Sequence, residues 1–191
     1  MWFDKILLLV YLASSFHEIT CKCPSMISRE KWNASAPVSV KPLSLNPPPF
    51  IVVHHSATQS CETEAACRKL VKSIQIYHIV DNQWEDIGYN FLIGGDGQVY
   101  EGRGWGIHGA HVKKYNNRSL GICLLGNYQD NEPPTIQIQT LKDLIRCAVE
   151  ENKTIDHYHL IGHRQGSATL CPGEKLFRII ESWPDFDHNP Q

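Results

Sequence analysis

The chain has 191 residues, 42% of them hydrophobic, which suffices for one domain with its own core. Its formal net charge is -2 at pH 7, and it contains no run of basic residues. This composition gives no indication of nucleic-acid binding, which requires clustered Lys and Arg side chains. A neutral polymer or a peptide remains compatible as a partner.

The N-terminus has the layout of a cleavable secretory signal. It reads MWFDKILLLVYLASS, in which a lysine precedes an apolar run from Ile6 to Ala13 and small residues follow. The run is too short to span a bilayer, and no later apolar stretch approaches that length. We therefore expect a signal peptide over residues 1–20, cleaved after Ser15 or after Thr20. The remaining residues, 21–191, would form a secreted, extracellular domain without membrane insertion.

The next patterns along the chain alternate between strand and helix. FIVVHH (50–55) is rich in β-branched residues and follows three prolines, so it predicts a strand. ETEAACRKLVKSIQIYHIV (62–80) predicts a helix. Its inward stripe comprises Leu70, Val71, Ile74, Tyr77 and His78. NFLIGGDGQVYEG (90–102) contains two apolar runs joined by a Gly-rich turn, which is the strongest hairpin signal in the chain.

The second half continues the alternation. SLGICLLG (119–126) and YHLIGH (158–163) predict buried strands. TIQIQTLKDLIRCAVEE (135–151) predicts a helix with Ile138, Leu141, Leu144, Ile145 and Ala148 on one face. PGEKLFRIIESW (172–183) predicts a last helix with Leu176, Phe177, Ile180 and Trp183 inward. This order predicts an α/β fold: a single domain with a central mixed β-sheet flanked by about three helices.

Export implies that most of the seven cysteines form disulfides, although the odd total leaves at least one unpaired. Cys61 and Cys67 are six residues apart, a separation that allows a bridge, and we expect this pair to form one. Cys123 lies in a predicted buried strand, where a thiol behaves as a small hydrophobe. Sequons compatible with a secreted glycoprotein begin at Asn33, Asn117 and Asn152.

Potential metal ligands occur in LIGHRQGSATLCPG (160–173). His163 and Cys171 lie in a segment too rich in Gly, Ser and Pro for a continuous helix or strand. An irregular backbone can bend two such donors onto one zinc ion, although a buried Cys and a separate surface His fit the spacing as well. His54 and His55 are candidates for a third ligand. They point to opposite faces of their strand, and the alternation alone does not decide between them.

Several motifs together resemble a known family. The segments are VHHSATQSC, DIGYNFLIGGDGQVYEGRGW, GAH, SLGICLLGNY and GHRQGSATLCPG. They are similar to the peptidoglycan recognition proteins, the animal relatives of bacteriophage N-acetylmuramoyl-L-alanine amidases. The similarity runs from about Cys23 to Trp183. It implies the amidase/peptidoglycan recognition fold.

The resemblance also implies a catalytic zinc site. Its ligands would be His54, His163 and Cys171, and three protein ligands leave a fourth position open. Zinc there would supply hydroxide near neutral pH and polarise a carbonyl, for hydrolysis of the amide between N-acetylmuramic acid and L-alanine in innate immunity. Tyr89 would be a catalytic residue that orients water or stabilises the oxyanion. Thr169, where the phage enzymes carry a lysine, would form hydrogen bonds to substrate or ligand.

The same resemblance implies further contacts. The partners would be bacterial peptidoglycan and muropeptides. His78 would border the ligand groove. His111 is a further candidate groove residue, because it lies in a loop whose Gly109 permits close backbone approach to a ligand. By the same resemblance, Arg118 would meet the additional carboxylate of diaminopimelate. We therefore expect a preference for diaminopimelate-type ligands, bound by a monomer.

The resemblance also implies the cysteine pairing. A second disulfide would join Cys23 to Cys147, while Cys123 and Cys171 would stay reduced. Cys21 would be unpaired or lost with the signal peptide.

Two other functions fit the sequence. The first is a non-catalytic receptor that binds peptidoglycan and triggers immune signalling. Family members that only bind commonly carry serine in place of the metal cysteine, whereas this chain keeps Cys171. The second is a protein in which Cys171 forms a disulfide and no metal binds.

Overall fold

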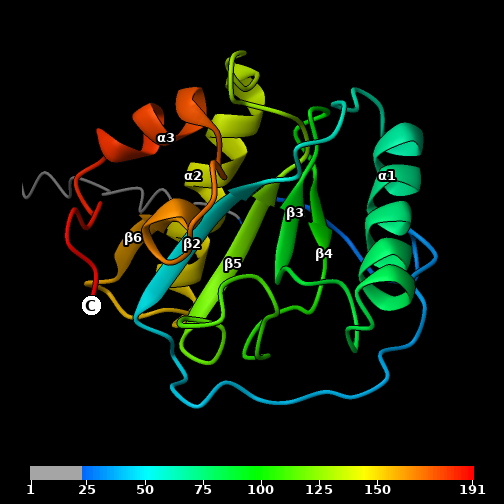
Figure 1. Ribbon diagram of the computed structural model, residues 1–191, viewed down its shortest axis with the longest axis horizontal. Coiled ribbons are helices and arrows are strands. Elements are labelled where there is room, and N and C mark those ends of the chain that lie inside the picture. The colour runs from blue at the N-terminus through cyan, green and yellow to red at the C-terminus, as the bar shows by residue number, and fades with distance from the viewer. Residues whose placement is uncertain (1–22) are drawn as a thin grey trace, which may run out of the picture.

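The computed structural model describes residues 23–191. The predicted signal peptide and Cys21 lie outside this range. The described chain forms one six-stranded mixed sheet with helices on both faces (Figure 1), which confirms the α/β fold expected from the sequence. Within residues 23–191, no helix combines the length and the apolar character needed to cross a membrane.

The secondary-structure elements follow the predicted order. They are β1 (Met26–Ile27), β2 (Phe50–His55), α1 (Glu64–Ile76), the π-helical turn η1 (Tyr77–Asp81), β3 (Phe91–Ile93), β4 (Val99–Glu101), β5 (Ser119–Leu124), α2 (Thr135–Glu150), β6 (His159–Gly162), the 3-10 turn η2 (His163–Gln165) and α3 (Glu174–Glu181). The two-residue strand β1 is the only strand among them that the sequence pattern did not predict.

The strand order across the sheet is β1-β4-β3-β5-β2-β6. β3 and β4 form the predicted antiparallel hairpin, and all other neighbours are parallel. β2 and β5 are interior strands of the sheet and are buried along their whole length. Helices on both faces explain why these strands read as continuous apolar runs rather than as alternating ones.

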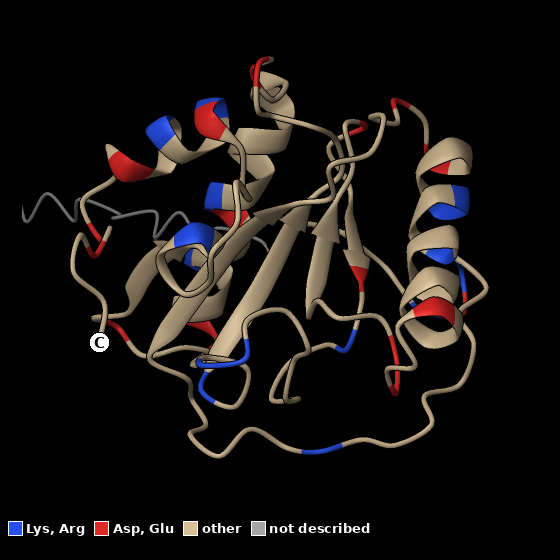
Figure 2. Cartoon of the chain, viewed as in Figure 1, with Lys and Arg blue, Asp and Glu red and all other residues tan. Residues whose placement is uncertain are grey.

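The helices divide between the two faces of the sheet (Figure 1). α2 and α3 cover the face that carries Ile51 and Val53 of β2. α1 covers the other face through Val71 and Ile74. Because side chains alternate along a strand, His54 belongs to the α1 face and His55 to the α2/α3 face. Charged residues lie mainly in helices and loops, and the strands are nearly free of them (Figure 2).

Five of the predicted inward side chains are less buried than the helical pattern indicates. Tyr77 is 55% exposed, because α1 ends at Ile76 and the next turn is π-helical, so the 3.6-residue period no longer applies there. Four others are only partly buried against the core: Leu70, Ile138, Phe177 and Trp183. The prediction for Tyr77 was therefore wrong, while the other four cover the rim of the core.

Two disulfides tie the described part of the chain, residues 23–191, together. Cys23 is bonded to Cys147 of α2, and Cys61 is bonded to Cys67 of α1, as predicted. Cys123 and Cys171 have no disulfide partner among residues 23–191. Within this range, Cys171 is thus available as a metal ligand.

Candidate metal centre and active site

His54, His163 and Cys171 come from three segments that meet at one edge of the sheet. β2 and β6 are parallel neighbours, so their C-terminal ends lie together, and these ends carry His54 and His163. Cys171 ends the loop that follows η2. One ligand atom of each residue lies within 4.8 Å of the other two. His54 Nδ1 and Cys171 Sγ are 3.7 Å apart.

This arrangement fits zinc. Tetrahedral zinc, with Zn–N near 2.0 Å and Zn–S near 2.3 Å, separates its ligand atoms by roughly 3.3 to 3.7 Å. The 3.7 Å between His54 Nδ1 and Cys171 Sγ already lies in this range, and no two of the three ligand atoms are more than 4.8 Å apart. Two imidazoles and one thiol form a soft donor set, and three protein ligands leave a coordination position for water or substrate.

Burial sets the protonation of the three donors. It lowers the pKa of His54 well below its usual range and that of His163 to about 4, so both rings are neutral near pH 7. Neutral imidazole is the form that binds metals. Burial raises the pKa of the Cys171 thiol to about 12, while a backbone hydrogen bond from His55 opposes this shift. A metal ion would therefore displace a proton from Cys171 on binding.

The loop between His163 and Cys171 is held by its own hydrogen bonds. The Arg164 N–H donates to the Cys171 carbonyl at 2.8 Å. The Cys171 N–H donates to Thr169 Oγ1 at 3.2 Å. The Arg164 side chain also forms an ion pair with Glu174 at 2.8 Å. Thr169 is exposed, and its hydrogen bond joins it to the backbone of Cys171, so its hydrogen bonding to substrate stays a prediction.

Tyr89 lies beside this cluster. Its ring centroid is 5.1 Å from that of His54. Tyr89 lines a hollow of about 500 Å³ together with His163, Thr169 and Cys171. Burial and the neighbouring Cys123 thiol raise the pKa of Tyr89 well above its usual range. The hydroxyl thus stays protonated near pH 7 and is able to act as a hydrogen-bond donor.

The structure decides between the two adjacent histidines of β2. His55 Nδ1 accepts a hydrogen bond from the Tyr128 N–H at 3.1 Å. Its ring lies 6.5 Å from that of Tyr128. His54, on the opposite face, supplies the atom that approaches Cys171 and His163.

His78 and His111 also lie close to the site. His78 Nδ1 accepts from the Gly88 N–H at 3.0 Å, and its ring packs 5.6 Å from that of Tyr89. His111 Nδ1 is 3.0 Å from His54 Nε2. Burial lowers the pKa of His78 to about 4 and that of His111 to about 3. Both rings are therefore neutral and packed against site residues.

Arg118 is not part of the cluster. It directly precedes β5, whose residue Cys123 pairs with His54, so the rise of a strand puts Arg118 roughly 16 Å from Cys123. Its guanidinium lies 4.9 Å from the ring centroids of both Phe50 and Tyr115, and it donates to the Gln191 carbonyl at 2.8 Å. Phe50 and His54 share one face of β2, so Arg118 lies on the face of the sheet that carries the cluster.

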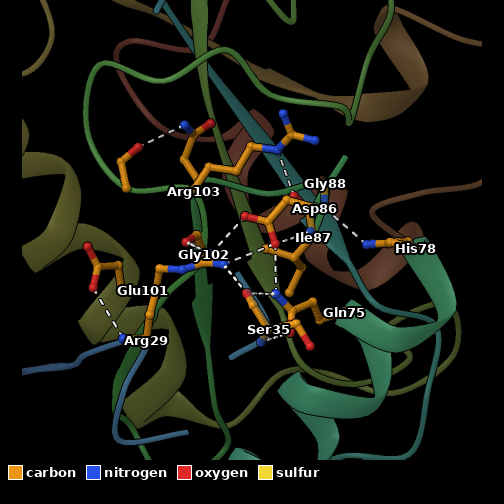
Figure 3. A network of polar contacts seen from close by, with 12 residues as sticks. Arg29, Ser35, Gln75, His78, Asp86, Ile87, Gly88, Glu101, Gly102 and Arg103 are labelled. Carbon is orange, nitrogen blue, oxygen red and sulfur yellow. Dashed lines mark hydrogen bonds and ion pairs between the residues drawn. The ribbon is translucent and has the colours of Figure 1, made fainter. Parts of the chain in front are cut away.

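A polar network around Asp86 was not predicted from the sequence (Figure 3). Asp86 is buried and forms an ion pair with Arg29 at 2.9 Å. Its Oδ1 accepts from the Gln75 amide and from the Ile87 N–H, both at 2.7 Å. Arg103 donates to the Ile87 carbonyl at 2.7 Å. The network fixes the segment that leads into Tyr89.

One feature of the sequence could have indicated this network. Gln75 lies between Ile74 and Ile76 in the apolar part of α1 and is completely buried. A buried amide requires hydrogen-bond partners, so it predicts polar groups packed against that helix. The identity of those partners was not accessible, because Arg29 is 46 residues away in the sequence.

Comparisons with known proteins agree with this arrangement. The sequence pattern of the family described as N-acetylmuramoyl-L-alanine amidase matches residues 44–174. Peptidoglycan-recognition protein 2 of Holotrichia diomphalia is 40% identical over 168 residues, which are 88% of this chain and 89% of the relative.

Two solved structures show the same fold. A Drosophila peptidoglycan recognition protein LB mutant in complex with tracheal cytotoxin is 40% identical, with a TM-score of 0.84 over 85% of this chain and 96% of that one. Peptidoglycan recognition protein LE in complex with tracheal cytotoxin, a monomeric diaminopimelic acid-type peptidoglycan, is 38% identical, with a TM-score of 0.83 over 85% and 95%. Sequence, fold and site together show that the chain belongs to the peptidoglycan recognition protein family.

Proposed function

We propose that the protein is a zinc-dependent N-acetylmuramoyl-L-alanine amidase, which hydrolyses the amide bond between N-acetylmuramic acid and L-alanine in peptidoglycan. The observation that carries this proposal is the convergence of His54, His163 and Cys171 beside Tyr89 at an open hollow. Zinc bound there supplies a water with a pKa near 7 and a Lewis acid for the scissile carbonyl.

The residues of the chain provide the rest of the chemistry. His54 and His163 are neutral and can bind the ion through ring nitrogens. The protonated Tyr89 hydroxyl donates a hydrogen bond to the oxygen on which negative charge develops. Thr169 accepts from the Cys171 N–H and so holds the thiolate ligand in place.

The proposed site of action is outside the cell, in innate immunity. The predicted signal peptide directs export, and disulfides such as Cys23–Cys147 and Cys61–Cys67 persist in oxidising compartments. The names of the relatives associate them with peptidoglycan recognition.

We propose diaminopimelate-type muropeptides as the favoured ligands. The structures of relatives LB and LE were solved with tracheal cytotoxin. The description of the LE complex identifies this ligand as a monomeric diaminopimelic acid-type peptidoglycan. The third residue of the stem peptide lies roughly 10 Å from the scissile amide when the chain is extended, and the diaminopimelate side chain reaches further. That reach is comparable to the separation between Arg118 and the end of the sheet that carries His54. A guanidinium stacked on Phe50 and Tyr115 is preorganised for a bidentate contact with the extra carboxylate.

The test combines metal content with product release. The purified mature chain should bind one zinc ion and release free stem peptide from a diaminopimelate muropeptide. Release without bound zinc would contradict the proposed chemistry. Binding of muropeptide by the zinc-loaded protein without any release would instead favour the non-catalytic receptor.

A further inference from the structure

His54 approaches other groups through both of its ring nitrogens. Nδ1 lies 3.7 Å from Cys171 Sγ, and Nε2 lies 3.0 Å from His111 Nδ1. A neutral imidazole carries one N–H, so one nitrogen donates and the other offers a lone pair. Binding of a metal through Nδ1 therefore requires the proton to sit on Nε2.

The neighbours of His54 specify the position of that proton. Ser119 Oγ donates its hydrogen to the Tyr115 carbonyl at 2.8 Å, and a carbonyl can only accept. The serine oxygen is then left as an acceptor towards His111 Nε2, at 3.4 Å. His111 consequently carries its proton on Nε2 and accepts through Nδ1. The group that donates to His111 Nδ1 is His54 Nε2–H.

The surroundings of this chain of hydrogen bonds are dry and well anchored. His54, His111 and Ser119 are all buried, so their polar atoms depend on one another rather than on bulk water. Asn116 Oδ1 accepts from the backbone N–H of His111 at 2.7 Å and fixes its loop. Gly121 lies against the ring, where an added Cβ would collide with the His111 side chain.

We propose that His111 and Ser119 are positioning residues that hold His54 as the Nε2–H tautomer, with the Nδ1 lone pair directed at the metal. This role for His111 differs from the ligand contact expected from the sequence. The inference rests on the proposed function, because the Nε2–H tautomer matters only if a metal binds the free Nδ1. The tautomer itself is a property of the metal-free protein and can be measured without any catalytic assay.

The first experiment reads the protons directly. Long-range ¹H–¹⁵N NMR spectra of the metal-free, ¹⁵N-histidine-labelled chain should show both His54 and His111 as Nε2–H tautomers. In Ser119→Ala, which removes only the hydroxyl, both rings should show a weaker preference for the Nε2–H tautomer. Thr154→Val is the matched control, since it removes a buried hydroxyl that donates to the Pro48 carbonyl elsewhere in the fold.

The second experiment measures zinc affinity by competition with a chromophoric chelator. His111→Leu removes the acceptor and should weaken zinc binding by about 10- to 100-fold, the usual range for groups that orient a metal ligand. His111→Asn keeps an acceptor oxygen near the position of Nδ1 and should recover part of this loss. Ser119→Ala should weaken zinc binding by an amount near the lower end of this range. Thr154→Val should bind zinc like the wild type.

The results separate this inference from the proposed function. An Nδ1–H tautomer for His54 in the wild type would overturn the positioning role, even if the protein proves to be a zinc amidase. Equal zinc affinities for His111→Leu, His111→Asn and the wild type would also overturn it. If the wild type bound no zinc, the proposed function would fail, while the NMR spectra would still report whether the hydrogen-bond chain sets the tautomer.

Discussion

Two buried polar clusters lie close to Tyr89 and are built in opposite ways. The cluster of Arg29, Asp86 and Gln75 contains opposite charges, and each Asp86 oxygen accepts hydrogen bonds or pairs with Arg29. The cluster of His54, His163 and Cys171 is neutral, and its donor atoms face one another. The first cluster is complete without a ligand, whereas the second becomes complete when a cation binds. The difference distinguishes a group that holds the fold from one prepared for chemistry.

Replacement of a metal ligand should have the largest effect and should leave the charged cluster unaffected. Cys171→Ser exchanges a soft thiolate for a hydroxyl that zinc binds poorly. We expect lower zinc affinity and no detectable release of stem peptide, with muropeptide binding largely retained. Hydrolysis and binding are measured on the same muropeptide.

The control is wild-type protein stripped of zinc with a chelator. It should be as inactive as Cys171→Ser and, unlike the variant, should regain activity when zinc is added. Full hydrolysis by the zinc-free variant would contradict the assignment of the metal centre.

The second prediction concerns the Cys23–Cys147 disulfide, which anchors the N-terminal segment that carries Arg29. The disulfide between Cys23 and Cys147 spans 124 residues, so removing both cysteines should lower the free energy of unfolding by about 4 to 5 kcal/mol. Removing Cys61 and Cys67, six residues apart, should lower it by about 2 to 3 kcal/mol. Chemical denaturation of the two double alanine variants gives both values. A smaller effect for the longer bridge would show that the Arg29 network holds the segment without the tether.

The third prediction disrupts the charged cluster itself. Asp86→Ala leaves Arg29, the Gln75 amide and the Ile87 N–H without their acceptor, and we expect a loss of about 3 kcal/mol in unfolding free energy. The adjacent Glu85, in an exposed pair with Lys41 at 3.7 Å, provides the control. Glu85→Ala should change stability by less than about 1 kcal/mol. Similar values for the two variants in denaturant titrations would argue against the structural role of Asp86.

The smallest expected effect lies outside both clusters and concerns ligand choice. Arg118→Ala should weaken binding of a diaminopimelate muropeptide by about 1.5 to 3 kcal/mol, the range of a hydrogen bond to a charged group. Binding of the matched lysine muropeptide should change little. Lys114→Ala removes a neighbouring exposed cation and should leave both affinities unchanged. Equal affinity of the wild type for both ligands would exclude the proposed preference.

Much of this protein could be predicted from local patterns. β2 and β5 read as continuous apolar runs because both of their faces are covered. The hairpin of β3 and β4 was visible in its Gly-rich turn. The 3.6-residue spacing of apolar residues correctly predicted α1, α2 and α3. It gave the wrong burial for Tyr77, where the helix becomes π-helical and the spacing changes. His163 and Cys171 stood out as potential zinc ligands, but their spacing fitted a separate Cys and His as well, and the zinc site with His54 came from the family resemblance.

The sequence by itself determined the fold class and the order of the elements, because these follow from periodicity and from short-range chemistry. The spacing of His163 and Cys171 left open whether they share one ion, and the set with His54 was an expectation from the family resemblance. Only the tertiary structure showed that His54 rather than His55 lies with Cys171 and His163, since strand alternation is symmetric until both faces have packed. The contacts of His54 with His111 and of Asp86 with Arg29 join residues 57 positions apart in each case. Such pairs depend on the strand order across the sheet, which no local pattern encodes.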